Sequence, residues 1–184
     1  MTLAPLELPA DLDQLDDAPA SRVEEGRILV VDDDARATAF MRRLIERDGF
    51  THVDTAGDGR RALHMIMDHP PHVVVLDVHL PLIDGYSVLR EIVRSDERTG
   101  RPTGVLAVSG DPTPATCQSI LWAGADDFIP RPFVSGEFTL RVRRLAKRTQ
   151  SLRRALAYSR FLERQVQSSE GLVGLADDDG GRWL

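Results

Sequence analysis

Hydrophobic residues in the first three quarters of the chain form short continuous runs that alternate with amphipathic stretches. Residues 28–31 and 73–76 are apolar at every position, which is typical of strands buried on both faces of a parallel sheet. Between these runs, residues 40–45 carry apolar side chains at helical spacing, and Gly49 follows as a helix-ending residue. The pattern therefore predicts strands and helices in alternation.

The same alternation continues toward the C-terminus. We expect further strands near residues 51–56, 105–108 and 127–130, and helices near residues 60–67, 86–94 and 111–123. The last of these helices is predicted to begin with Asp111 as its N-cap and Pro112 at its first helical position. Five β-α units predict an α/β fold with a doubly wound, five-stranded parallel sheet and right-handed crossovers.

A long final helix is predicted because no Gly or Pro occurs between Gly136 and Gly171. Several apolar residues in it follow an alternating three-four spacing, which favours a coiled coil and a homodimer. The positions expected to form the dimer contact are Val142, Leu145, Leu152 and Leu156. The alternative is a single helix that frays at its end.

Charge is unevenly distributed along the chain. Residues 1–26 contain seven acidic residues and one basic residue, whereas residues 135–170 contain nine basic and three acidic residues. The basic block could bind nucleic acid, but a solvated helix face that offsets an acidic domain is the simpler interpretation, so no direct nucleic-acid contact is expected. The sequence shows no signal peptide and no apolar run long enough for a bilayer, which predicts a cytoplasmic protein without membrane contact.

Acidic and hydroxyl side chains follow three of the predicted strands. Asp32 and Asp33 end the first strand, Asp77 ends the third and Ser109 ends the fourth. Ligands in open α/β sheets bind beyond the carboxyl ends of the strands, so these side chains are expected to converge. Convergent carboxylates repel one another, and a hard divalent cation such as Mg²⁺ relieves that repulsion. Asp34 is expected to cap the following helix instead.

This arrangement is suited to phosphoryl transfer. Two carboxylates hold the cation while the third attacks phosphorus, and the cation neutralises the phosphoryl oxygens. The Ser109 hydroxyl could donate to one phosphoryl oxygen, and Arg131, just after the fifth strand, is the candidate cation for another. We therefore assign Asp77, Ser109 and Arg131 to the reacting site.

Three segments of the chain resemble the receiver domain of bacterial two-component response regulators, the CheY-like family with a flavodoxin-like fold. They are ILVVDDD at 28–34, VVVLDVHLPLIDG at 73–85 and GADDFIPRPF at 124–133. The resemblance implies that Asp77 accepts a phosphoryl group from a sensor histidine kinase or a phosphotransfer protein.

Further roles follow from the same resemblance. It implies that Asp33 binds Mg²⁺ directly, that Asp32 binds it partly through water, and that Asp77 and the backbone carbonyl of His79 complete the metal site. Ser109 and Phe128 match the family's switch residues. The bond between Arg131 and Pro132 is expected to be cis. The family places lysine where this chain has Arg131, and the two side chains are not interchangeable. We expect that the domain can still be phosphorylated, but that its switching or the lifetime of its phosphoryl group is altered.

The resemblance also divides the chain. We expect a disordered acidic leader over residues 1–26, the receiver domain over 27–148, a dimerisation or signalling extension of the last helix over 149–170, and a flexible tail over 171–184. The output is assigned either to a separate partner or to an effector domain outside this sequence.

We expect a phosphoacceptor that is not an enzyme and that at most hydrolyses its own phosphate slowly. Two other functions are alternatives to it. A haloacid-dehalogenase-type phosphohydrolase also uses an aspartyl phosphate, but its Asp-x-Asp pattern matches only Asp32–Asp34, and Arg36 stands where threonine or valine is expected. A phosphorylation-independent receiver-like interaction module is favoured by Arg131 alone.

Overall fold

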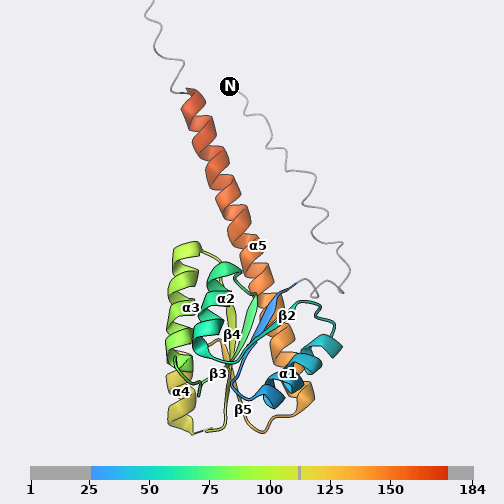
Figure 1. Ribbon diagram of the computed structural model, residues 1–184. Helices are drawn as coiled ribbons and strands as arrows, with labels where there is room; N and C mark the ends of the chain where they lie inside the picture. Colours follow the sequence, from blue (N-terminus) through green and yellow to red (C-terminus); the bar gives the residue numbers. More distant parts are fainter. Residues whose placement is uncertain (1–25, 112, 174–184) are drawn as a thin grey trace, which may run out of the picture.

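Five parallel strands form the centre of the molecule (Figure 1). The computed structural model describes residues 26–111 and 113–173, with side chains described to residue 166. The strands lie in the order β2-β1-β3-β4-β5, which confirms the predicted doubly wound sheet. Their bounds are Ile28–Val31 for β1, Val53–Ala56 for β2, Val73–Asp77 for β3, Gly104–Ser109 for β4 and Asp127–Pro130 for β5.

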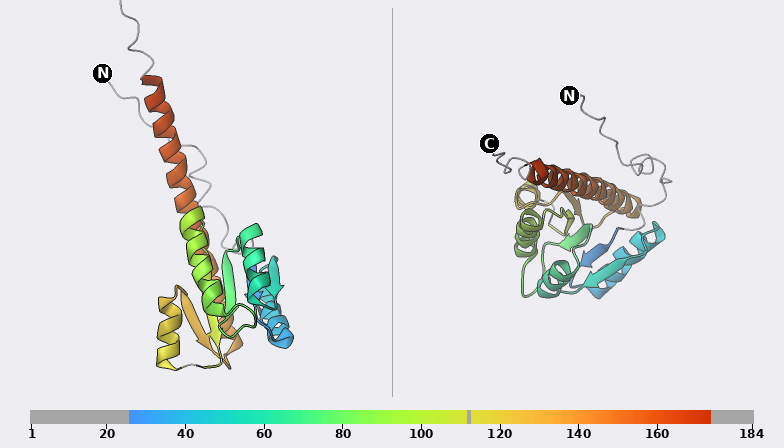
Figure 2. Two further views of the ribbon diagram at one scale, coloured as in Figure 1. Left: turned by 60° about the vertical axis from the view of Figure 1, so that its left-hand side comes forward. Right: turned by 90° about the horizontal axis from the view of Figure 1, so that it is seen from above.

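Five helices alternate with these strands among the described residues. They are α1 (Ala35–Arg47), α2 (Gly59–Asp68), α3 (Gly85–Thr99), α4 (Pro114–Trp122) and α5 (Ser135–Val173). Successive strand side chains point to opposite faces of the sheet, so each fully apolar strand needs a helix layer on both sides. Ile28 and Val30 pack in one cluster with residues of α1 and α5, whereas Leu29 and Val31 pack in the other with residues of α2, α3 and α4. The two views of Figure 2 show these layers.

Side-chain caps set where the helices begin. Asp34 is the N-cap of α1 and its carboxylate accepts from the backbone N–H of Arg36 at 2.8 Å, as predicted. The prediction for α4 was wrong. Thr113 is its N-cap, and Pro114 follows at the start of the helix. The Thr113 hydroxyl accepts from the N–H of Thr116, so the Thr-Pro pair has the role that the sequence suggested for Asp111-Pro112.

Helix α5 runs the length of the domain and projects beyond it (Figure 1). It begins after β5, at the carboxyl edge of the sheet, and runs back past the opposite edge. It continues to Val173, so Gly171 does not end the helix. The predicted leader, apart from Gly26, and the tail beyond Val173 lie outside the described residues. None of the helices in the described part of the chain is long and apolar enough to cross a bilayer.

The predicted dimer positions divide into two groups. Val142 and Leu145 have exposed fractions of 1% and 6% and lie in the core cluster with β1 and β3, so they are not available to a partner helix and their assignment is corrected. Leu152 is 44% exposed, and Leu156 is half-buried. The apolar spacing of α5 therefore reflects packing on the sheet in its first half.

Two arginines that sequence reasoning missed hold the next part of α5 against the body. Arg153 donates from Nε to the carbonyl of Pro102 at 2.7 Å, and its Nη atoms donate to the carbonyls of Pro70 and Pro71. Arg160 donates to the carbonyls of Thr99 and Gly100 at 3.1 and 2.8 Å, where α3 ends. These carbonyls precede β3 and β4 or end α3, so they lie at the amino edge of the sheet, away from the aspartates that follow β1 and β3. The helix therefore stays in contact with the domain beyond residue 148.

Candidate functional site

Three aspartates meet at the carboxyl edge of the sheet. β1 and β3 are adjacent and parallel, with Val31 opposite Leu76, so the residues that follow both strands are brought side by side. Carboxylate oxygens of Asp32, Asp33 and Asp77 lie within 4.8 Å of one another. Asp32 and Asp77 are buried, and Asp33 is exposed. The predicted convergence of these three side chains is confirmed.

Backbone N–H groups orient the two buried carboxylates. Oδ1 of Asp32 accepts from the N–H of Asp34 at 2.9 Å, and Oδ1 of Asp77 accepts from the N–H of His79 at 2.9 Å. Burial raises the pKa of Asp32, and the nearby Asp77 charge raises it further, while the Asp34 N–H and the Arg131 guanidinium oppose the shift. The negative charge of Asp32 is therefore costly without a cation beside it.

Arg131 supplies one cation. Nη1 donates to Oδ2 of Asp77 at 3.0 Å, and Nη2 donates to Oδ2 of Asp32 in a second, shorter contact. The backbone N–H of Arg131 donates to the carbonyl of Ser109 at 2.8 Å, and the Arg131–Pro132 bond is cis, as expected. The predicted proximity of Arg131 to Asp77 is therefore confirmed, whereas its contact with Asp32 was not foreseen from the sequence.

Ser109 lies at the end of β4, opposite Pro130 of β5, and is fully buried. Its hydroxyl accepts from the N–H of Asp111 at 3.1 Å, which fixes the start of the loop after β4. Phe128 is on the neighbouring strand, half-buried against the cluster formed with α2, α3 and α4. The two predicted switch residues thus lie on paired strands next to the site, and their switch role stays a prediction.

His79 follows β3 at the rim of the site. Its side chain is exposed, and its N–H orients Asp77. The role of its backbone carbonyl as a metal ligand stays a prediction.

Gly85 lets the chain after β3 fold closely beneath Asp77. A Cβ at this position would lie 2.5 Å from the Asp77 carbonyl oxygen and 2.7 Å from Cα of Val78. Such distances are not tolerated, so only glycine fits between α3 and the end of β3. The close approach positions the loop that carries His79 around the acidic cluster.

The donor set of the cluster fits a hard divalent cation. All three side chains offer carboxylate oxygens, which Mg²⁺ prefers, and the exposed Asp33 leaves the cluster open to water on one side. A surface hollow of about 310 Å³ opens beside Asp32 and Asp33, between the ends of β1 and β2 and helix α1. The residues present therefore suit an oxygen-ligated cation that keeps water ligands.

A second hollow is lined by apolar residues beside Arg131. It has a volume of about 390 Å³, and Phe40 and Phe133 contribute to it together with Arg131. The Phe40 and Phe133 rings stack with centroids 6.5 Å apart, and Phe40 is 48% exposed. An exposed aromatic surface thus adjoins the acidic cluster.

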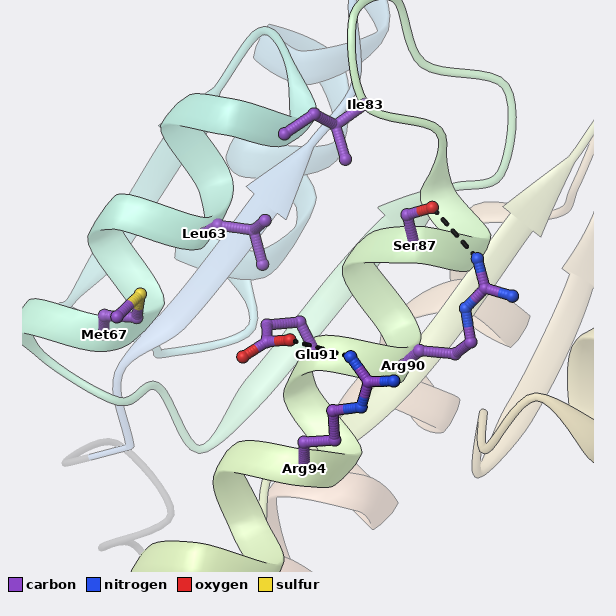
Figure 3. A pocket seen from close by; sticks show the side chains of 7 residues that line it. All are labelled: Leu63, Met67, Ile83, Ser87, Arg90, Glu91 and Arg94. Carbon is purple, nitrogen blue, oxygen red and sulfur yellow. Dashed lines mark hydrogen bonds and ion pairs between the residues drawn. The ribbon is translucent and has the colours of Figure 1, made fainter.

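A further groove separates α2 from α3 (Figure 3). It has a volume of about 480 Å³ and an apolar floor that includes Leu63 and Ile83. Its charged rim is internally paired, with Arg90 donating to the Ser87 hydroxyl at 3.1 Å and Arg94 lying 3.6 Å from Glu91. None of its lining residues belongs to the acidic cluster, so the groove is separate from the candidate site.

Several basic residues of α5 have polar partners within the chain. Arg141 pairs with Asp127 and Glu137, Arg143 pairs with Asp48, and Arg148 pairs with Asp126. The arginines already described at 153 and 160 donate to backbone carbonyls. These contacts support the interpretation of the basic block as a helix face that offsets acidic neighbours.

Comparisons with known proteins agree with this geometry. Residues 28–143 match the family model for the response regulator receiver domain. The response regulator MprA of Mycolicibacterium vanbaalenii is 39% identical over 123 residues, which cover 67% of this chain and 51% of that protein. The chain therefore spans about half the length of this curated relative.

Solved structures show the same fold. The receiver domain of Francisella response regulator 1452 superposes with a TM-score of 0.62 at 31% identity, covering 67% of this chain and 98% of that one. The BeF3-activated DrrB receiver domain superposes with a TM-score of 0.59 at 30% identity, covering 66% and 97%. This chain belongs to the receiver-domain family of two-component response regulators.

Proposed function

We propose that Asp77 accepts a phosphoryl group from a phosphohistidine on a sensor histidine kinase or a phosphotransfer protein. The supporting observation is the position of Asp77, which ends β3 beside Asp32 and Asp33 with Arg131 donating to its Oδ2. An Asp77 oxygen attacks phosphorus, the bond between phosphorus and the imidazole nitrogen breaks, and the phosphoryl group is transferred to the carboxylate.

The cation and the basic side chain have distinct parts in this step. The residues that would hold a Mg²⁺ ion are Asp32, Asp33, Asp77 and, through its backbone carbonyl, His79. The ion would supply charge neutralisation at the phosphoryl oxygens. Arg131 donates to one phosphoryl oxygen, and the Ser109 hydroxyl donates to another once the loop after β4 rearranges. Movement of Ser109 and Phe128 together relays the phosphorylation state across the β4–β5 edge.

In this proposal the protein is a phosphoacceptor and not an enzyme with a free substrate. Water slowly hydrolyses the aspartyl phosphate of the protein, and this hydrolysis resets the signal. The signal passes to an output partner or to an effector domain outside this sequence, and the exchange takes place in the cytoplasm. The hollow lined by the exposed Phe40 and the half-buried Phe133 is the docking surface for the phosphohistidine partner, because it adjoins Arg131 and offers apolar contact area.

We also propose a homodimer formed by the second half of α5. Its contact residues differ from those expected from the sequence. Because Arg153 and Arg160 face the domain, the opposite side of the helix is directed outward. That side carries a three-four-three-four spacing that suits a parallel partner helix. The contact residues are Leu152, Ala155, Ser159, Leu162 and Val166.

Phosphoacceptance is tested with acetyl phosphate and Mg²⁺, followed by intact mass. The expected result is the addition of one phosphoryl group to the wild-type protein and none to Asp77→Asn. Asp54→Asn is the matched control, because Asp54 lies in β2 and pairs with Arg27 instead of with the site. Modification that persists in Asp77→Asn would refute the assignment.

The phosphorylation-independent module is the second candidate, because Arg131 already forms ion pairs with both buried carboxylates. It predicts no added mass and no binding of beryllofluoride, with dimerisation unchanged. The same experiment therefore separates the two functions.

A further inference from the structure

Every oxygen of the two buried carboxylates already has a donor in this chain. The Oδ1 atoms of Asp32 and Asp77 accept from the backbone N–H groups of Asp34 and His79. The Oδ2 atoms of the same two residues accept from the two Nη atoms of Arg131. A single guanidinium thus bridges the phosphoacceptor and one of the candidate metal ligands.

The bridge depends on the shape of the guanidinium. Its two Nη atoms diverge from one carbon, so they donate to two carboxylates at once, whereas a lysine ammonium is one nitrogen at one point. The backbone of Arg131 is held by its N–H to the Ser109 carbonyl and by the pairing of β4 with β5. The guanidinium is therefore directed into the cluster by a rigid part of the sheet.

Burial makes these two contacts strong. The side chain of Arg131 is 27% exposed, and those of Asp32 and Asp77 are 0% and 7% exposed. Charge-assisted hydrogen bonds in such surroundings are stronger than those between exposed groups. Asp33, the exposed member of the cluster, is the one carboxylate of the three that Arg131 does not contact among the described residues.

We propose that Arg131 is an internal counter-ion that competes with a divalent cation for Asp32 and Asp77. A cation that enters the cluster must draw on carboxylate oxygens that the guanidinium already holds, and it meets a positive charge at the same place. Binding of Mg²⁺ therefore requires Arg131 to release Asp32. The released guanidinium is then available to a phosphoryl oxygen, so that the cation prepares Arg131 for its proposed part in phosphorylation; only this last step rests on the proposed function.

The affinity for Mg²⁺ tests this competition. Isothermal titration calorimetry of the unphosphorylated full chain compares the wild type with Arg131→Lys and Arg131→Gln. We expect the lysine variant to bind Mg²⁺ about tenfold more tightly than the wild type, because one charge-assisted hydrogen bond no longer has to be broken. The glutamine variant, which has no charge, should bind at least as tightly as the lysine variant. Asp33→Asn is the control that must weaken binding in every background.

A wild-type affinity equal to or tighter than that of both variants would overturn the proposal. A second measurement needs no variant to fold. The side-chain ¹⁵N resonances of Arg131 in the wild-type protein should lose the signature of hindered guanidinium rotation at saturating Mg²⁺, while those of Arg153 stay unchanged. Arg131 resonances that do not respond to Mg²⁺ would contradict the competition.

The outcome is separable from that of the phosphorylation experiment. If acetyl phosphate adds no mass to Asp77 but the order of Mg²⁺ affinities holds, the phosphoacceptor function fails and the competition stands. If the mass appears but the affinities do not differ, the phosphoacceptor function stands and the competition fails.

Discussion

Nη1 of Arg131 donates to Oδ2 of Asp77 across 3.0 Å, although 54 residues separate the two in the chain. The contact links the end of β3 to the segment after β5, two strands that do not touch each other in the sheet. It exists because β4 lies between them and fixes Arg131 through the Ser109 carbonyl. The site is therefore assembled by the strand order, and residues that support that order should matter as much as those that carry charge.

Gly85→Ala should damage both stability and the site. An added methyl group would overlap the backbone at Asp77 and Val78, and overpacking of this kind costs about 2 kcal/mol in the free energy of unfolding. The matched control is Gly57→Ala, because a Cβ there meets nothing within 4 Å. Urea denaturation and acetyl phosphate labelling measure the two effects. Equal stability of the two variants would show that the close approach at Gly85 is not required.

Phe40→Ala should slow phosphoryl transfer from a phosphohistidine protein without changing labelling by acetyl phosphate. The ring is 48% exposed beside Arg131, so its loss removes contact area for a protein partner and leaves Asp77 intact. We expect about a tenfold lower kcat/KM, as for a single aromatic contact at an interface. Leu121→Ala, which removes an exposed apolar side chain on α4, is the control. A reduction with acetyl phosphate as well would place the defect in the site.

The free energy of unfolding should fall as the pH is lowered through the titration range of His72. Burial lowers the pKa of His72, and the positive charge of Arg153 lowers it further. Nδ1 of His72 also accepts from the N–H of Arg27 at 3.2 Å, a bond that requires this nitrogen to be unprotonated. The unfolded chain therefore takes up the proton first, starting near the ordinary value of 6.5, and stability is lost below that pH until the folded protein is protonated too.

The variant His72→Asn keeps an acceptor near the Nδ1 position and removes the titration. Denaturant midpoints measured from pH 8 to pH 5, a range of about three units around the ordinary pKa of histidine, should fall more steeply for the wild type. His64→Asn is the control, because His64 is exposed and pairs with Asp68. Parallel pH profiles for the wild type and His72→Asn would contradict this account.

The sequence predicts features that have a local pattern, and it misses those that depend on contacts between residues far apart in the chain. Unbroken apolar runs predict strands such as β1 and β3. Because the two strands are adjacent and parallel, the acidic residues that follow them must converge. The three-four spacing of Val142 and Leu145 is ambiguous, because a helix that packs on a sheet and a helix in a coiled coil use the same period. The spacing alone gave the wrong partner for these residues.

Other features depend on contacts that have no local signature. The carbonyls that receive Arg153 come from the segments before β3 and β4, so no motif in α5 marks this arginine among its neighbours. The contact of Arg131 with Asp32 likewise depends on side-chain reach across the sheet edge, which the identity of the residue permits but does not specify.

Arg153→Met should loosen the middle of α5. The substitution keeps the apolar part of the side chain but leaves the carbonyls of Pro102, Pro70 and Pro71 without this donor, which costs about 2 kcal/mol in the free energy of unfolding. Arg154→Met is the control, because Arg154 is exposed on the next position of the helix. Hydrogen exchange should become faster at amides after Thr149 in the first variant only. Equal exchange in both variants would mean that packing alone holds the helix.

Leu162→Glu should break the proposed α5 dimer. Leu162 is 40% exposed and lies on the outward stripe with Leu152, so a charge there would be desolvated when two helices pair. We expect the dissociation constant to rise about a hundredfold, measured by sedimentation equilibrium. Phe161→Glu is the control. It changes a neighbour of similar exposure, but the rotation of about 100° per residue turns Phe161 to another side of the helix. Because Val142 and Leu145 are buried in the domain, their substitution should lower stability instead of changing association at a fixed folded concentration. Dissociation by Phe161→Glu but not by Leu162→Glu would show that a different face of α5 forms the contact.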